Sequence, residues 1–260
     1  MDVGGIEIIN FPDMQIPVRR EPTNEIYLAL EPPEALPYVV APFEMPIGEV
    51  VAFIQQHADA LHELRAEMIK HFKKTKSLRC RFRTGDVAYL LGRPFMLRCY
   101  PLSSTKKATK ATRTRTSLTA TMNRDISVID LYVAQVGNYD QGRAAFMSYA
   151  QIIFSNNIKS LLQQCMERVF PGVAVPANVR SRPMRDSWVR IDEDRDTVWF
   201  SVSLIPFPAH AVVYTFLNEA VKLYAPQADE DERVELIARG VPNWQEIKAL
   251  LANPDSRFVL

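Results

Sequence analysis

Residues 204–224 read LIPFPAHAVVYTFLNEAVKLY, and this stretch determines the layout of the C-terminal half of the chain. Two prolines, Pro206 and Pro208, precede sixteen residues that contain neither proline nor glycine. Proline is tolerated in the first turn of a helix and disrupts its interior. The stretch therefore predicts a helix from about Pro208 to Tyr224, directly after a strand that ends near Leu204.

Outward from this helix, short strand-like runs alternate with helical patterns. Short strands are expected before it, near residues 178–182, 187–191 and 198–204. Further upstream, residues 139–170 carry apolar side chains every three or four positions, which predicts a second long helix, and Pro171-Gly172 ends it. Residues 229–251 predict one or two more helices.

The N-terminal half is rich in proline and in strand-like runs. Eight of the eighteen prolines lie in residues 1–46, where they favour short edge strands and extended connections. A helical period over residues 46–72 predicts one long amphipathic helix. Strands are expected over the remaining apolar runs, at residues 25–30, 38–41, 78–82, 94–100 and 125–133.

This order of elements predicts an α+β fold with small, mainly antiparallel sheets and long amphipathic helices. We expect a Pro-rich N-terminal extension (1–24), a β-rich part (25–137) with the helix at 46–72, and a helix-rich part (138–260). The last two parts are expected to form one continuous domain.

Composition excludes several classes of function. The chain has 260 residues, a hydrophobic fraction of 47% and a net charge of +1, so no overall field attracts nucleic acid or a membrane surface. It has only nine glycines and no phosphate-binding or nucleophile-elbow motif. Three cysteines without C-x-x-C spacing argue against disulfides and thiolate zinc sites. With no signal-peptide pattern and no long apolar run, we expect a cytoplasmic protein with free thiols and no membrane partner.

Residues 103–121 form the one segment with a strong charge bias. They hold five basic residues and no acid, and are expected to form a loop; its basic residues are Lys106, Lys107, Lys110, Arg113 and Arg115. Such a segment can contact phosphates of nucleic acid or an acidic protein partner. It lacks aromatic side chains on which bases stack, so a solvated loop is the favoured interpretation.

Six short segments resemble, in their order and spacing, the YgjP-like metallopeptidase family, which is similar to the SprT-type zinc proteases. The resemblance covers about residues 25–252 and implies a zincin-like C-terminal half. The segments that carry it are Tyr38-Val-Val-Ala-Pro42, residues 85–97, Met184-Arg-Asp-Ser-Trp188, Leu204-Ile-Pro-Phe-Pro208, residues 213–220 and Pro242-Asn-Trp244.

The resemblance implies a zinc site whose ligands this chain has lost. The family carries His-Glu-x-x-His on a helix, where two imidazoles bind Zn²⁺ and the Glu acts as base. The matching string here is Asn218-Glu219-Ala220-Val221-Lys222. No histidine follows His210 to serve as the third ligand, and the family's Trp-Gly-Ser-Cys signature is reduced to Trp188-Val-Arg-Ile191. We therefore expect no bound cofactor.

The resemblance thus predicts a degenerate, bacterial-type metallopeptidase homologue that acts as a binding or regulatory module. Its vestigial cleft is expected to contain Trp188, Tyr214, Asn218 and Lys222, with Glu219 as a vestigial base. An ammonium at Lys222 can form an ion pair with Glu219 at i, i+3 and replace the charge of the missing metal.

Two other functions remain open. The first is a metal-dependent hydrolase that combines Glu219 with the acidic stretch Asp229–Glu232. The second is a nucleic-acid-associated protein that uses the basic segment. His62-Glu63 begins a zincin string, but the fourth residue after His62 is Ala66, and His57 is expected to be a core histidine.

Overall fold

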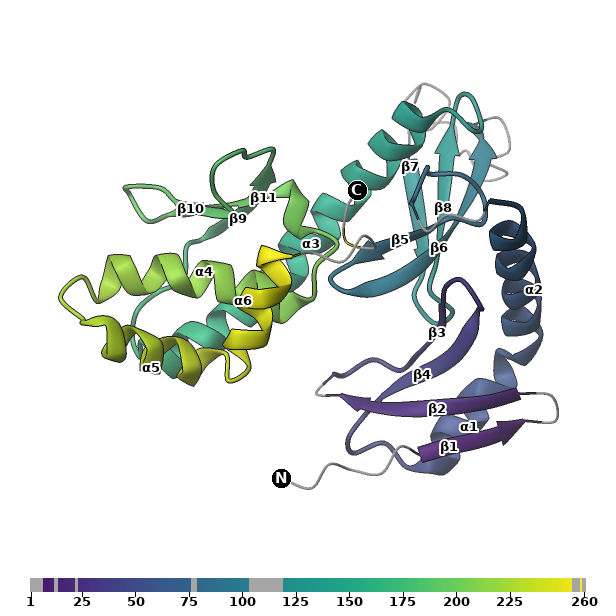
Figure 1. Cartoon of the computed structure of the whole chain (residues 1–260), viewed down its shortest axis with the longest axis horizontal. Coiled ribbons are helices and arrows are strands. Elements are labelled where there is room, and N and C mark those ends of the chain that lie inside the picture. The colour runs from purple at the N-terminus through teal and green to yellow at the C-terminus, as the bar shows by residue number, and fades with distance from the viewer. Residues whose placement is uncertain are drawn as a thin grey trace, which may run out of the picture. The chain divides into compact units, whose positions relative to one another are not determined.

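The computed structural model describes residues 7–11, 14–21, 23–75, 79–102, 119–253 and Phe258. Helices and three small sheets confirm the α+β class (Figure 1). The chain divides into two compact units, one of residues 1–88 and 93–146 and the other of residues 89–92 and 147–260. In the described part of the chain, no helix is both long and apolar enough to cross a membrane.

The first sheet of the N-terminal unit includes residues that were expected to lie in an extension. Its order is β1 (Glu7–Phe11), β2 (Met14–Glu21), β4 (Leu36–Pro42), β3 (Tyr27–Glu31). Met14, Ile16 and Val18 of β2 are buried, as the alternation of a strand requires. Pro17 pairs with Ile8 of β1, and pairing with β4 begins only at Val18, so the missing N–H of the proline breaks no bond to β4.

The helical pattern over residues 46–72 forms two helices instead of one. α1 (Ile47–Gln56) and α2 (Ala58–Thr75) are separated at His57, whose backbone has φ −108° and ψ 8°. The expected apolar face is nevertheless buried, and it comprises Val50, Ile54, Leu61, Leu64, Met68 and Phe72. A one-residue break leaves these side chains on the same face, so the period alone does not reveal it.

The second sheet has the order β5 (Val87–Leu90), β6 (Arg93–Pro101), β8 (Val128–Val133), β7 (Thr119–Asn123). The strand expected at residues 78–82 is absent from the described residues 79–82. The backbone N–H groups of Arg81 and Arg83 instead donate to the Asp86 carboxylate, at 2.8 and 2.9 Å. Each of the three sheets contains one parallel pair, β2–β4, β6–β8 or β9–β11, so the sheets are mixed.

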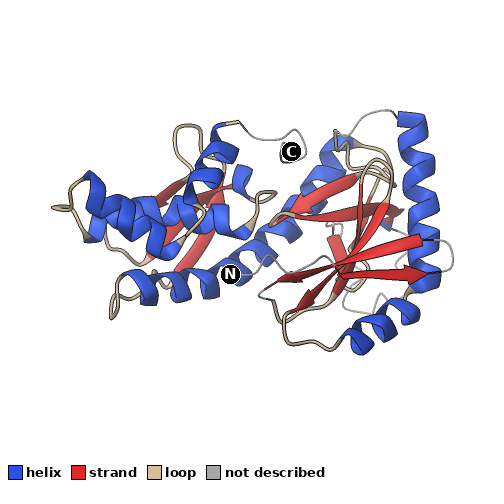
Figure 2. Ribbon diagram, turned by 60° about the horizontal axis from the view of Figure 1, so that its bottom comes forward, coloured by secondary structure: helices blue, strands red, loops and turns tan. Residues whose placement is uncertain are grey.

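The C-terminal unit is built around a small sheet with the order β10 (Val189–Ile191), β11 (Thr197–Ser201), β9 (Asn178–Arg182). Its helices are the C-terminal part of α3 (Tyr139–Val169), then α4 (Ala209–Tyr224), α5 (Glu230–Gly240) and α6 (Trp244–Ala252). Phe200 of β11 packs edge-on against Phe154 of α3, with ring centroids 5.6 Å apart. The three strands gather on one side of α4 (Figures 1 and 2).

A hairpin from the first half of the chain completes this unit. The backbone N–H groups of Leu91 and Gly92 donate to the carbonyls of Ile205 and Pro206, at 2.8 and 3.1 Å. These bonds hold the proline-rich turn that precedes α4. The helix expected from about Pro208 to Tyr224 is therefore confirmed, and its start is fixed by contacts with residues 89–92.

Candidate functional site

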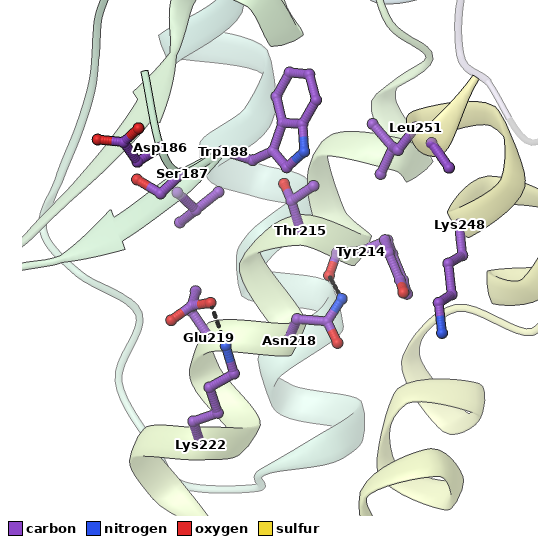
Figure 3. A pocket seen from close by; sticks show the side chains of 12 residues that line it. Asp186, Ser187, Trp188, Tyr214, Thr215, Asn218, Glu219, Lys222, Lys248 and Leu251 are labelled. Carbon is purple, nitrogen blue, oxygen red and sulfur yellow. Dashed lines mark hydrogen bonds and ion pairs between the residues drawn. The ribbon is translucent and has the colours of Figure 1, made fainter. Parts of the chain in front are cut away.

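A pocket of about 450 Å³ opens on the C-terminal unit between the start of β10 and the helices α4 and α6. Its walls come from three places in the sequence (Figure 3). The lining residues are Asp186, Ser187, Trp188 and Val189 before and in β10, Tyr214, Thr215, Asn218, Glu219 and Lys222 of α4, and Lys248, Leu251 and Ala252 of α6.

The helical period explains why the string Asn218–Lys222 faces the pocket. Asn218 and Lys222 lie one turn apart, and Thr215 and Glu219 lie one turn apart beside them. Residues 211–217 of α4 are all buried, whereas Asn218 and Glu219 are half-buried and Lys222 is exposed. The helix thus passes from the core to the pocket wall at these three residues.

Lys222 and Glu219 form the expected ion pair. Lys222 Nζ lies 2.7 Å from Glu219 Oε1, as drawn by the dashed line in Figure 3. The two side chains are 63% and 39% exposed, so solvent screens the pair and its contribution to stability is small. Its effect on the site is larger, because it neutralises the carboxylate that a metal-dependent hydrolase needs as a free base.

The other polar side chains of α4 in the pocket bond to their own helix. Asn218 Nδ2 donates to the Tyr214 carbonyl at 3.3 Å, and Thr215 Oγ1 donates to the Val212 carbonyl at 2.8 Å. Tyr214 is buried. These contacts fix the wall of the pocket without any bound group.

Trp188 forms the aromatic rim. It is 36% exposed, and its ring meets Phe207 edge-on at a centroid distance of 5.9 Å. Its carbonyl accepts the N–H of Ser201 at 2.8 Å, which attaches this segment to the end of β11. The structure therefore brings all five predicted cleft residues, Trp188, Tyr214, Asn218, Glu219 and Lys222, to one pocket.

The donor set of this pocket does not fit a catalytic zinc. Such a zinc takes three protein ligands from His, Cys, Asp and Glu. Among the lining residues only Asp186 and Glu219 belong to these types, and Glu219 is paired with Lys222. Over the described ranges, no three or more His, Cys, Asp or Glu residues are grouped so that they could hold a metal ion.

The acidic stretch Asp229–Glu232 has a structural role at the start of α5. Asp229 Oδ1 accepts the N–H of Glu232 at 2.9 Å, and Glu232 Oε2 accepts the N–H of Asp229 at 3.1 Å. This reciprocal capping box satisfies helix N–H groups that otherwise lack partners. The stretch does not line the pocket of Glu219, so the structure does not bring together the two halves of the alternative metal site.

The basic segment and His57 are the remaining candidates. The basic residues Lys106, Lys107, Lys110, Arg113 and Arg115 fall outside the described residues, while residues 119–121 of that segment belong to β7. His57 was expected in the core, but it is half-buried at the break between α1 and α2. Its Nδ1 lies 2.9 Å from the Phe53 carbonyl, and its Nε2 lies 3.7 Å from Asp125.

Sequence reasoning missed several residues of the pocket. The residues that were not expected there include Asp186, which precedes β10, Thr215 of α4, and Lys248 and Leu251 of α6. Lys248 and Leu251 are spaced by one helical turn, so a common face was predictable. What that face meets was not predictable, because it depends on how α6 packs against α4.

Among the comparisons with known proteins, the family match covers almost the whole chain. A family model described as YgjP-like, metallopeptidase domain, matches residues 24–254. This range includes every segment that lines the pocket. Neither a curated protein nor a solved structure matches the chain.

Proposed function

Since the chain belongs to the YgjP-like metallopeptidase family, we propose that it is a catalytically inactive member that binds a peptide segment in the pocket beneath Trp188. The peptide is held without being cleaved, and the protein acts as a binding or regulatory module. We further propose that it does so in the cytoplasm, in keeping with its three free thiols at Cys80, Cys99 and Cys165.

The observation that carries this proposal is the 2.7 Å ion pair between Lys222 and Glu219. In a metallopeptidase with His-Glu-x-x-His, the second imidazole and the metal lie next to the base, and the metal polarises the attacked amide. Here an ammonium stands at the second ligand position and bonds to the carboxylate. The pair supports a site in which the ammonium replaces the positive charge of the metal and the carboxylate no longer acts as a base.

The composition of the pocket wall supports a peptide ligand. Trp188 and Leu251 offer an apolar surface, while Ser187 and Lys248 offer hydrogen-bond donors. Sites that combine apolar walls with a few polar groups are typical of ligand binding. An extended peptide presents an apolar side chain and backbone carbonyls together, which matches this combination.

The proposal is tested with unfolded, carboxymethylated casein as substrate and as ligand. The protein, purified without chelators, is expected to contain substoichiometric zinc and to leave the casein intact. Binding of fluorescently labelled casein, followed by anisotropy, is expected to be saturable. Trp188→Ala should weaken it roughly tenfold, since loss of a buried aromatic contact costs more than about 1 kcal/mol.

Ile152→Ala is the matched control, because Ile152 is 60% exposed on α3 of the same unit and lies outside the pocket. It should leave casein binding unchanged. Stoichiometric zinc together with hydrolysis that Glu219→Gln abolishes would establish a metal-dependent peptidase and overturn the proposal. Equal casein binding by the wild-type protein and Trp188→Ala would overturn the assignment of the pocket.

A further inference from the structure

The outer face of the sheet β10–β11–β9 carries arginines on both sides of a tryptophan. Val189, Val198 and Phe200 point into the core of the unit and are buried. The residues that alternate with them, on the opposite face, are Arg180 and Arg182 of β9, Arg190 of β10 and Trp199 of β11.

The strand register places these side chains in one row. Trp199 is directly opposite Arg180 in the parallel pair and directly opposite Arg190 in the antiparallel pair. Neighbouring strands are about 4.8 Å apart, so the row from β9 to β10 spans roughly 10 Å. The arginines are exposed and the indole is half-buried.

The ring of Trp199 is held in place on this face. Its Nε1 donates to Asp192 Oδ2 at 2.9 Å. The guanidinium carbons of Arg182 and Arg180 lie 4.6 and 5.7 Å from the ring centroid. The result is a fixed aromatic ring with two guanidinium groups close to it.

The positive charges on this face are not neutralised by carboxylates. Within the described ranges, Arg180, Arg182 and Arg190 form none of the ion pairs at 4.0 Å or less. The hairpin between β10 and β11 carries four acids, Asp192, Glu193, Asp194 and Asp196. Asp192 accepts a hydrogen bond from Trp199, and Asp196 accepts one from Asn178. The face therefore offers cations that are free to bind an anionic partner.

We propose that this arginine–tryptophan face binds single-stranded nucleic acid. Guanidinium groups bind phosphates through paired N–H donors, and bases stack on indole rings and on guanidinium planes. Only a single strand exposes the faces of its bases. The proposal uses neither the pocket of Glu219 nor the basic segment at residues 106–115.

The test is fluorescence anisotropy of the full chain with labelled fifteen-nucleotide dT and rU oligomers at two salt concentrations. Arg182→Gln/Arg190→Gln should weaken binding about tenfold. It should also reduce the slope of log K against log salt by about 1.4, since each phosphate contact of a single strand contributes about 0.7. The control, Arg168→Gln/Arg239→Gln, removes two exposed arginines from α3 and α5 of the same unit and should change the affinity little.

A second pair of variants isolates stacking. Trp199→Leu should weaken oligonucleotide binding about tenfold, while Trp199→Phe keeps an aromatic face and should retain most of it. The proposal is wrong if the protein binds neither oligomer. It is also wrong if Arg168→Gln/Arg239→Gln weakens oligonucleotide binding as much as Arg182→Gln/Arg190→Gln does. Heparin, which has charge and no bases, is the competitor. One further outcome would overturn the proposal: heparin binds as tightly as the oligomers, and Trp199→Leu changes the affinity for neither heparin nor the oligomers. The face would then bind acidic polymers in general.

Discussion

The ammonium of Lys222 and the carboxylate of Glu219 show how single residues decide the chemistry of this pocket. The same helix with imidazoles at positions 218 and 222 would present two metal ligands one turn apart. With an amide and an ammonium there, one side chain bonds back to its own helix and the other neutralises the retained base. Two side chains therefore alter the chemistry of the site without altering α4.

The buried thiols provide a prediction at the residue scale. Burial raises the pKa of Cys165 from its ordinary value of 9.0 to about 11, with a smaller lowering by Arg168. Above pH 9 the unfolded chain loses this proton before the folded protein does, so the free energy of unfolding falls as the pH rises from 9 to 11. Cys165 is expected to account for a loss on the order of 2 kcal/mol.

Urea unfolding at pH 8, 9, 10 and 11 measures this effect in the wild-type protein and in Cys165→Ala. The variant is less stable at pH 8 because it leaves a small cavity. Its stability should then decline less between pH 9 and pH 11. Parallel curves for the two proteins would contradict the prediction, since other groups that titrate in this range are common to both.

At the scale of elements, the ends of helices explain the acidic stretch Asp229–Glu232 and the break at His57. The acidic stretch Asp229–Glu232 is the N-terminal cap of α5, and its negative charges lie at the positive end of the helix dipole. The break at His57 similarly separates α1 from α2 without changing which residues are buried. Both features depend on where the backbone hydrogen bonds of a helix begin and end. The spacing of apolar residues along the sequence does not predict these positions.

The capping box yields the prediction at this scale. Asp229→Ala removes the acceptor for the N–H of Glu232 and should lower the free energy of unfolding by about 1 kcal/mol. Asp231→Ala, in the same first turn but outside the capping box, loses only a charge–dipole interaction and should cost less, about 0.3 to 0.5 kcal/mol. Urea unfolding at neutral pH compares the two, and an equal cost would show that the cap is not the source of the stability.

At the scale of the whole molecule, the unit that holds the pocket is not continuous in sequence. Residues 89–92 belong to it although the rest of the unit begins at residue 147. Gly92 has φ +82°, and a Cβ there would lie 2.9 Å from the Cα of Pro208, the N-cap residue of α4. This close approach ties the hairpin to the helix that carries the pocket.

Gly92→Ala should therefore lower the free energy of unfolding by roughly 2–4 kcal/mol. Part of this loss comes from the strain of a positive φ at alanine, and part from the clash of its Cβ with the backbone of Pro208. Gly172→Ala is the matched control, because Gly172 has φ +80° and a Cβ there meets nothing within 4 Å. It should cost only the conformational strain, about 1–2 kcal/mol. Urea unfolding of both variants separates the two contributions, and equal losses would show that the contact with Pro208 is unimportant.

The sequence by itself determined the α+β class, the helices at residues 139–169 and 209–224, and the family to which the chain belongs. It also determined the ion pair between Glu219 and Lys222, because residues three apart on a helix are neighbours whatever surrounds them. These features depend on local geometry and on periodicity.

Only the tertiary structure decided which distant residues share a site. Lys248 and Leu251 line the same pocket as Trp188 because α6 packs against α4. Arg180 lies over the ring of Trp199 because β9 pairs in parallel with β11. Residues 7–11 and 14–21 join a sheet instead of forming an extension, because β2 pairs directly with β4, although β3 lies between them in the sequence. Such contacts arise from the packing of elements far apart in the chain, and no local pattern of residues specifies them.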